Sequence, residues 1–524
     1  MKRRAFVLRT LGGVAASLFG RGAFAQGSGS AMHAMSGMAP SSAQSEVPLA
    51  AADALPSGAP LAALRVLASE SREPGHFRAT LVARPAARSL LAGQPDTVFW
   101  QYDAAAGGVD GPAVGPLIDV REGDTVEIRF VNRLPQPSTI HWHGLPVPPG
   151  QDGNPVDLVV PGGERVYRFT LPAGSAGTYW YHPHPHMLTS EQVFRGLAGP
   201  FVVRAADDPF AHWPERHLFI SDLKISADGT IPMNGMMDWM NGREGQFALV
   251  NGALRPTIDV TRDERWRVWN GCSARYLLLA FDDGRKFAQI GSDGGLLAAP
   301  RDGLTSLLLA PGERAGLVVR AGSAHSRASL IAARYDRRKM AMSHGSLPAE
   351  PARVLADVRF APSSASPPDT LPARLREIAP LGAPRAQQSV VFSEAMDMYA
   401  MHQPGASSLR MPRGMTFMVN GAAFDPARIT LTSRRGEVEH WSIENRTDMD
   451  HPFHLHGTQF QVLERERGGA RIAEPYLAWR DTVNVEPGET VRIATVQRDA
   501  GNRMFHCHIL EHEDLGMMGT LHVI

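Results

Sequence analysis

The C-terminal stretch of the chain crowds together side chains that bind soft metal ions. Residues 503–519 read Arg-Met-Phe-His-Cys-His-Ile-Leu-Glu-His-Glu-Asp-Leu-Gly-Met-Met-Gly, so three histidines and a cysteine are followed by two adjacent methionines. Imidazole, thiolate and thioether groups are polarizable donors, and this set suits copper better than it suits a hard cation. The stretch therefore predicts a copper site.

Three other histidine clusters share the His-x-His spacing of this stretch. Side chains of an extended strand alternate between its two faces, so both imidazoles of His-x-His lie on one face, about 6 to 7 Å apart. At that separation they can share a metal cluster. The clusters comprise His141 with His143, His182 with His184 and His186, and His451 with His454 and His456.

The same alternation separates the residues His506, Cys507 and His508. The two imidazoles face one side of a strand, and the thiolate between them faces the other side. A single short piece of backbone can thereby connect two different metal sites.

The elements that hold these clusters are expected to be β-strands in several domains. A chain of 524 residues exceeds the size at which one core keeps growing. Its 43% hydrophobic share, 51 Gly and 40 Pro favour a turn-rich β protein. Its 53 basic and 53 acidic residues balance, which argues against nucleic acid as a partner. Cys272 and Cys507 are not expected to form a disulfide, because Cys507 would hold metal as a thiolate.

Two local patterns each occur three times, always in the same order. The first runs from a charged turn through an alternating strand to Asn, and the second is Pro-Gly and Glu before another alternating strand. They occupy residues 121–132, 260–270 and 434–445, and residues 161–164, 311–313 and 487–489. Copies roughly 140 to 175 residues apart predict three related all-β domains, each the size of a Greek-key sandwich.

The first 25 residues have the pattern of a signal peptide. Paired Arg3 and Arg4 precede a short apolar run and an Ala-Phe-Ala sequence that ends at Ala25. This pattern resembles a twin-arginine signal, with an ordinary secretory signal as the alternative. No later stretch reaches the roughly 18 uninterrupted apolar residues of a transmembrane helix. We expect a bacterial periplasmic monomer, exported by the twin-arginine (Tat) machinery and not inserted into a membrane.

The four histidine clusters, two near the start and two near the end of the chain, resemble those of the multicopper oxidases, the family of laccases and copper-efflux oxidases. The resemblance covers roughly residues 62–524 and implies three cupredoxin-like Greek-key β-sandwich domains. The expected segments are a signal peptide (1–25), a flexible Met-containing N-terminus (26–61), domain 1 (62–205), domain 2 (206–360), a linker (361–385) and domain 3 (386–524).

The resemblance also implies the metal ligands. A trigonal His, His and Cys set with a weak axial thioether makes an electron-transfer copper. Type 1 copper would take His451, Cys507, His512 and the axial Met517; type 2 copper would take His141 and His454; and the type 3 pair would take His143, His182, His184, His456, His506 and His508. Asp152 and Glu513 stand at the positions of the family's proton-relay carboxylates, against the alternative of a solvated loop acid and a charge oriented by a strand.

The implied activity is one-electron oxidation of phenolic or aromatic donors, or of Cu(I), coupled to four-electron reduction of O2 to water. Met449, Met396, Met398 and Met401 resemble positions that bind substrate copper in copper-efflux oxidases, because thioethers favour the cuprous ion. The Met-rich segment is short, so we expect type 1 copper to be open to bulky organic donors.

Two other functions fit parts of the pattern. A copper-binding or cell-division scaffold of the same fold would lack oxidase activity, and such relatives lack ligands that are all present here. A copper nitrite reductase is disfavoured, because that family has two domains and no set of four such clusters.

Overall fold

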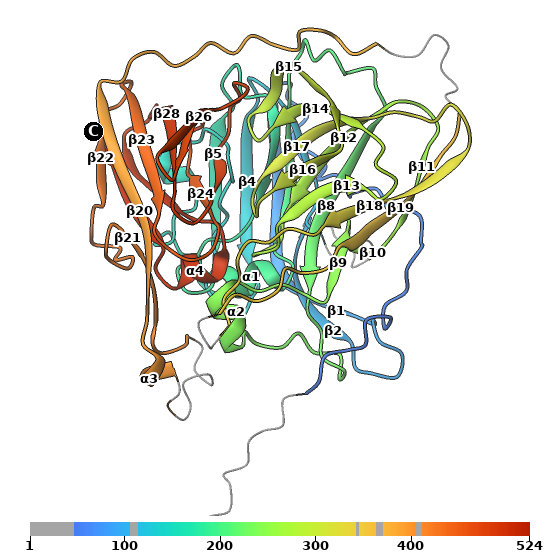
Figure 1. Ribbon diagram of the computed structural model, residues 1–524, viewed down its shortest axis with the longest axis horizontal. Coiled ribbons are helices and arrows are strands. Elements are labelled where there is room, and N and C mark those ends of the chain that lie inside the picture. Colours follow the sequence, from blue (N-terminus) through green and yellow to red (C-terminus); the bar gives the residue numbers. More distant parts are fainter. Residues whose placement is uncertain (1–46, 105–113, 342–344, 363–369, 402, 404–410) are drawn as a thin grey trace, which may run out of the picture. The chain divides into compact units, whose positions relative to one another are not determined.

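The computed structural model describes residues 47–104, 114–341, 345–362, 370–401, 403 and 411–524. Nearly all of its regular structure is β-strand, and the strands form six sheets (Figure 1). The predicted signal peptide, residues 1–25, lies outside the described residues. Among those described, no helix is both long and apolar enough to cross a membrane.

The first two sheets are built from residues 76–204. The four-stranded sheet has the order β2 (Thr97–Ala104), β1 (His76–Arg88), β4 (Thr125–Asn132) and β5 (Glu164–Thr170), and the three-stranded sheet has the order β3 (Ile118–Arg121), β7 (Gly199–Arg204) and β6 (Gly177–Tyr181).

The next two sheets are built from residues 215–360. The seven-stranded sheet has the order β10 (Ala253–Leu254), β9 (Phe247–Val250), β8 (Glu215–Leu223), β12 (Glu264–Asn270), β17 (Arg314–Val319), β14 (Phe287–Ser292) and β15 (Gly295–Leu304). The five-stranded sheet has the order β11 (Thr257–Val260), β19 (Arg353–Phe360), β18 (Ser326–Ala333), β13 (Leu277–Phe281) and β16 (Ser306–Leu309).

The last two sheets are built from residues 386–523. The six-stranded sheet has the order β21 (Met415–Val419), β20 (Ala386–Met396), β23 (Val438–Asn445), β28 (Glu489–Val496), β25 (Phe460–Arg467) and β26 (Ala470–Ala473). The five-stranded sheet has the order β22 (Leu431–Ser433), β30 (Met518–Val523), β29 (Gly501–Cys507), β24 (His451–Leu455) and β27 (Thr482–Val485).

The two sequence patterns that recur three times form the same pair of strands in each part of the chain. The strand of the first pattern is β4, β12 or β23, and it pairs antiparallel with the strand that follows the Pro-Gly, which is β5, β17 or β28. In each case the strand of the first pattern also pairs parallel with an earlier strand, which is β1, β8 or β20. The predicted threefold repeat is therefore present in the sheet topology, while the exact domain boundaries stay a prediction.

Each pair of sheets encloses its own hydrophobic core, because the inward residues of both sheets meet between them. Examples are Leu81 and Phe201 in the first pair, Leu218 and Val358 in the second, and Phe392 and Phe505 in the third.

The described part of the predicted flexible N-terminus contacts the middle of the chain. Leu49 forms an antiparallel bridge with Ser226, and Ser57 and Pro60 form parallel bridges with Leu254 and Thr257. Backbone pairing of this kind leaves no periodic signal in the sequence. The start of domain 1 at residue 62 stays a prediction.

Short helices occur in the connections between strands. They are the 3-10 helix η1 (Pro149–Gln151) and the α-helices α1 (Thr189–Phe194), α2 (Met236–Asn241), α3 (Met398–Met401) and α4 (Leu510–Asp514). Helices α1 and α2 both contact α4, and the three gather at one place in Figure 1. Helix α4 carries His512 and Glu513, so this contact covers one of the predicted ligands.

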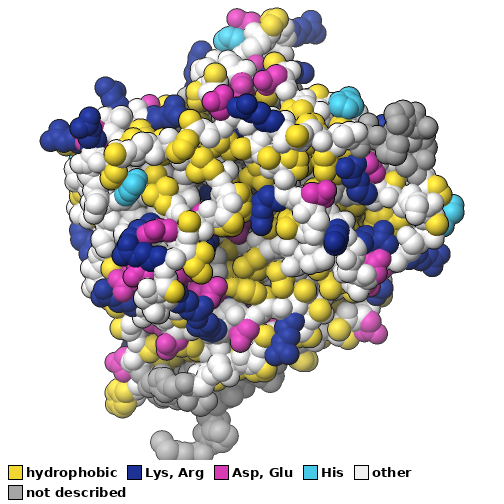
Figure 2. All heavy atoms as spheres, turned by 45° about the horizontal axis from the view of Figure 1, so that its top comes forward, with side chains coloured by type: hydrophobic (Ala, Val, Ile, Leu, Met, Phe, Trp, Pro, Cys, Tyr) yellow, Lys and Arg dark blue, Asp and Glu magenta, His cyan; other side chains and the backbone are white. Residues whose placement is uncertain are grey.

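A cavity of about 1020 Å³ has walls from all three pairs of sheets. Its lining includes Tyr179 of β6, Leu296 of β15 and Val496 of β28. Figure 2 shows one face of the molecule, hollowed near its centre, where hydrophobic side chains gather. Basic and acidic side chains are interspersed over this face, in agreement with the zero net charge.

Candidate metal centre

The pairing of β24 with β29 brings two predicted ligand clusters together. In the antiparallel register His454 lies opposite His506, and Phe453 lies opposite Cys507. Successive residues of β29 therefore face different surroundings: Cys507 groups with His451 and His512, while His506 groups with His184 and His456. This is the separation that strand alternation predicts.

The Cys507 site is compact and buried. The Sγ atom of Cys507 lies 3.3 Å from Nδ1 of His451, and Nδ1 of His512 lies 3.3 Å from the same His451 nitrogen. All three side chains are 0% exposed. The backbone N–H of Ile509 donates to the sulfur at 3.3 Å, a contact that favours a thiolate.

The residues around this site fix the two imidazoles. Nε2 of His451 contacts Oγ1 of Thr447 at 2.8 Å, and Nε2 of His512 contacts the carbonyl oxygen of Met240 at 3.2 Å. The ring of Phe417 stacks on His512, with centroids 3.9 Å apart. Because the Nε2 atoms are engaged in this way, the Nδ1 atoms of both rings face the sulfur.

Met517, the predicted axial ligand, belongs with Cys507 to the hydrophobic core of the last pair of sheets. The N–H of Cys507 donates to the carbonyl oxygen of Met517 at 3.0 Å, and the Met517 side chain is fully buried.

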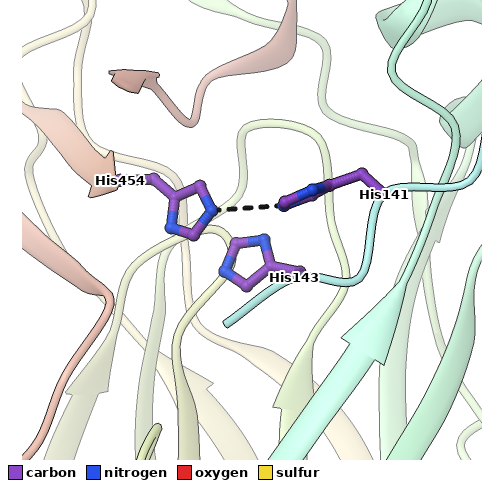
Figure 3. A group of neighbouring side chains, drawn as sticks. All are labelled: His141, His143 and His454. Carbon is purple, nitrogen blue, oxygen red and sulfur yellow. Dashed lines mark hydrogen bonds between the residues drawn. The ribbon is translucent and has the colours of Figure 1, made fainter. Parts of the chain in front are cut away.

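The other eight predicted histidine ligands form a second site. They fall into three groups whose ring nitrogens are close enough to share metal ions, and the first two groups have His143 in common. The groups are His141, His143 and His454; His143, His182 and His508; and His184, His456 and His506. Figure 3 shows the first group, in which Nε2 of His141 and Nε2 of His454 point toward each other at 3.4 Å. All eight side chains are 0% exposed.

Asp152 and Asp481 contact the outer nitrogens of this histidine cluster. The carboxylate of Asp152 contacts Nδ1 of His141 at 3.0 Å and Nδ1 of His456 at 3.2 Å. Asp481 contacts Nε2 of His143 at 3.0 Å, and its carbonyl oxygen accepts from Nδ1 of His454 at 2.9 Å. In each of these rings the nitrogen that faces away from the other histidines has a hydrogen-bond partner. This partner fixes the tautomer and leaves the ring nitrogen that faces the cluster free to bind metal.

Glu513, the second predicted carboxylate, lies beside His184 of the cluster. Its carboxylate is 3.8 Å from Nδ1 of His184 and is fully buried. Burial, and then the neighbouring Asp514, raise the pKa of Glu513 well above its usual range. The raised pKa favours the protonated form of this carboxyl group, which is the form that a general acid needs.

The electrostatics of both sites fit a soft, positively charged ion. Burial, more than any other cause, lowers the pKa of most of these histidines, including His451 and His506, each to about 3. Their lone pairs are therefore available at neutral pH. Burial likewise raises the pKa of the Cys507 thiol, so the thiolate needs a bound cation. A buried set of neutral imidazoles and one sulfur suits copper.

The methionines predicted to bind substrate copper are mostly packed in the core. Met449 is fully buried, Met401 is 4% exposed, and Met396 packs against the core that contains Cys507. Met398 begins α3, and its side chain lies outside the described residues.

Several contacts of these sites have no signal in the sequence. Thr447, Asp481 and the carbonyl of Met240 each engage a ligand ring, although none belongs to a recurring motif. His186, which extends the second cluster, is absent from the metal-binding groups of the described residues.

Comparisons with known proteins place the chain in a family. Family models described as multicopper oxidase match residues 97–208 and 396–524. The chain is similar to a solved multicopper oxidase from Campylobacter jejuni, described as a metallo-oxidase, with 40% identity and a TM-score of 0.83 over 91% of this chain and 98% of that one.

Two curated relatives also match most of the chain. The multicopper oxidase mco of Staphylococcus haemolyticus is 31% identical over 426 residues, which is 79% of this chain and 83% of the relative. The cell division protein FtsP of Edwardsiella tarda is 30% identical over 434 residues, which is 79% of this chain and 84% of the relative. These matches confirm the predicted fold of cupredoxin-like β-sandwich domains, and the chain belongs to the multicopper oxidase family.

Proposed function

We propose that this protein is an oxidase that takes single electrons from Cu(I), and less readily from phenolic or aromatic donors, and uses them to reduce O2 to water. One observation carries the proposal: a buried His, His and Cys site and a buried eight-histidine cluster are joined through consecutive residues of one strand, β29.

The proposed ligand assignment follows the two sites. Type 1 copper takes His451, Cys507, His512 and Met517; type 2 copper takes His141 and His454; and the type 3 pair takes the remaining two groups, His143, His182 and His508, and His184, His456 and His506. Copper, when bound, supplies one-electron redox chemistry and the binding of dioxygen. The neutral, buried donors described above support this choice of metal.

The protein's own residues provide the path and the protons. His506 and His508 flank Cys507 directly in the chain, so a single peptide bond joins Cys507 to a member of each of these two histidine groups. Asp152 orients His141 and His456 through their outer nitrogens and, as a carboxylate beside the cluster, takes part in the proton relay. Glu513, whose pKa is raised by burial, lies beside His184 and is positioned to deliver a proton to the cluster.

Burial of the type 1 ligands favours a small donor. The sequence predicted that type 1 copper would be open to bulky organic molecules, but His451 and His512 are both 0% exposed. Helix α2 contributes to this cover, since Trp239 and Met240 belong to the same core as Cys507. A phenol therefore finds no exposed imidazole edge. Met396 and Met401, by contrast, belong to or pack against the core that contains Cys507, and their thioethers are ligands that suit Cu(I).

A comparison of donors tests this proposal. Steady-state oxygen uptake is measured with Cu(I), Fe(II), Mn(II), a dimethoxyphenol and bilirubin on the copper-loaded protein. We expect kcat/KM for Cu(I) to exceed that for the phenol by at least about 10-fold, a difference of about 1.4 kcal/mol in transition-state binding. A phenol oxidised as efficiently as Cu(I) would contradict the argument from burial.

A scaffold without oxidase activity is the second candidate, favoured by the similarity to FtsP. The complete set of clustered ligands argues against it. A copper-loaded protein that is colourless and consumes no O2 with any of these donors would establish the scaffold function instead.

The proposed location is the periplasm. It rests on the N-terminal sequence alone, where Arg3 and Arg4 precede the apolar run. Export in a strain that lacks the twin-arginine machinery should stop, with the precursor retained in the cytoplasm. Normal export in that strain would point to the general secretory route.

A further inference from the structure

The middle pair of sheets has no His-x-His sequence, yet one of its side chains reaches the histidine cluster through a single intermediary. That intermediary is Asp481, which directly precedes β27 and is fully buried. Its Oδ1 lies 3.0 Å from Nε2 of His143. The next residue, Thr482, places its hydroxyl 3.2 Å from the same nitrogen and 3.2 Å from Nδ1 of His454. Two consecutive residues thus contact the outer nitrogens of two ligand rings.

Arg314 binds the carboxylate of Asp481 through two hydrogen bonds. It is the first residue of β17, and its guanidinium is 0% exposed. Nη1 donates to Oδ1 of Asp481 at 2.7 Å, and Nη2 donates to Oδ2 at 2.6 Å. Its Nε donates to the carbonyl oxygen of Thr178 in β6 at 2.7 Å. A bidentate guanidinium–carboxylate pair is strong and fixes the plane of the carboxylate, so Asp481 cannot turn.

The carboxylate of Asp293 accepts hydrogen bonds from the backbone of both Arg314 and Asp481. Its Oδ1 accepts the backbone N–H of Arg314 at 2.8 Å. Its Oδ2 lies 3.3 Å from the N–H of Asp481 and 3.4 Å from the N–H of Thr482. A wholly buried group of two acids and one guanidinium is costly to remove from water, and its ordered geometry argues for a role beyond general stability.

The backbone beside His143 is fitted to this clamp of Arg314, Asp481 and Asp293. Gly144 has a φ of +85°, and a Cβ there would lie 2.2 Å from Oδ2 of Asp481 and 2.6 Å from Nη2 of Arg314. Only glycine leaves room for the clamp at this position.

The clamp determines which nitrogen of His143 is free. Because Nε2 faces Asp481, that nitrogen carries the proton, and Nδ1 keeps its lone pair. Nδ1 is the atom that lies 3.2 Å from Nε2 of His508 and 3.4 Å from Nε2 of His182, inside the cluster.

We infer that Arg314 is a positioning residue for the histidine cluster: it fixes Asp481, and Asp481 fixes the tautomer and the orientation of His143. The inference rests on the proposed copper-binding function and extends it by giving the middle part of the chain a role in the metal site.

Two variants test the inference. Arg314→Lys keeps the charge but loses the bidentate fork. Asp481→Asn keeps the volume and leaves Arg314 beside Asp293 at 3.4 Å, so it remains informative if the lysine variant does not fold. The asparagine of Asp481→Asn has one acceptor oxygen, whereas His143 and Arg314 each need an acceptor, so one of them loses its partner. Arg216→Lys is the matched control, because Arg216 also forms a bidentate pair, with Glu264, away from the described metal-binding groups.

Three properties are measured. Chelator competition gives the affinity for copper, and visible absorbance gives the blue cysteine-to-copper charge-transfer band of the Cys507 site. Nitrogen NMR of the metal-free protein gives the tautomer of His143. We expect the affinity of the histidine cluster for copper to fall about 10- to 100-fold in both variants, while the blue band stays unchanged. We also expect His143 to lose its uniform Nε2–H tautomer. Unchanged cluster affinity and tautomer in a folded variant would overturn the inference. Wild-type protein that binds no cluster copper would instead overturn the proposed function.

Discussion

Replacing Cys507 by Ser should abolish the blue colour of the copper-loaded protein and lower donor-dependent oxygen uptake by more than about 100-fold. Removing an outer partner of a ligand typically costs about 10- to 100-fold, and here a ligand itself is lost. A serine hydroxyl is a hard, neutral donor that cannot replace the thiolate beside His451 and His512. It also interrupts the path to His506 and His508. Visible absorbance and an oxygen electrode measure both effects.

The matched control is Cys272→Ser. Cys272 is equally buried, but its sulfur lies near the carbonyl oxygen of Ile220 and belongs to the core of the middle sheets. This variant should keep its blue colour and its oxygen uptake. If Cys507→Ser kept an intense blue band, the assignment of the type 1 site would be wrong.

Replacing Asp152 by Asn should slow the reduction of O2 by about 10²- to 10⁴-fold, the range typical of lost general acid–base catalysis. The two carboxylate oxygens of Asp152 contact Nδ1 of His141 and Nδ1 of His456. Asparagine keeps the volume but has one acceptor oxygen, so one ring loses its partner and the negative charge disappears. The Cys507 site shares no described contact with Asp152, so the blue colour should remain.

Rapid mixing of the reduced protein with O2 measures this step separately from electron uptake. The blue band should reappear slowly in Asp152→Asn. Asp157→Asn is the control, because this nearby acid is 31% exposed and faces Arg165 at 3.7 Å. An Asp152→Asn variant that reoxidises within twofold of the wild-type rate would remove Asp152 from the catalytic machinery.

Much of the site was predictable because its ligands are local in sequence. His-x-His on an extended strand has a fixed geometry, so residues 506–508 alone predicted that Cys507 and its neighbouring histidines would face different sites. The threefold strand pattern likewise predicted β4, β12 and β23, together with the strands that pair with them. Local periodicity and turn residues carry that information.

The partners of the ligands were not predictable for the same reason. Arg314 and Asp481 are 167 residues apart, and neither the Pro-Gly-Glu motif before Arg314 nor the sequence around Asp481 indicates that they meet. Their contact depends on how β17 packs beside β6 and β27, which is tertiary structure. The burial of His512 escaped prediction too, because Met240 of α2 contacts its ring from a distant part of the chain.

The electron balance of the reaction tests the central claim most directly. The copper-loaded protein is supplied with a known amount of Cu(I), and O2 consumption, Cu(II) formation and hydrogen peroxide are followed together. Our account predicts four Cu(I) oxidised for each O2 consumed, with no peroxide released, because the eight-histidine cluster completes the reduction to water. Two Cu(I) oxidised per O2 with accumulation of peroxide, or no O2 consumption at all, would contradict it.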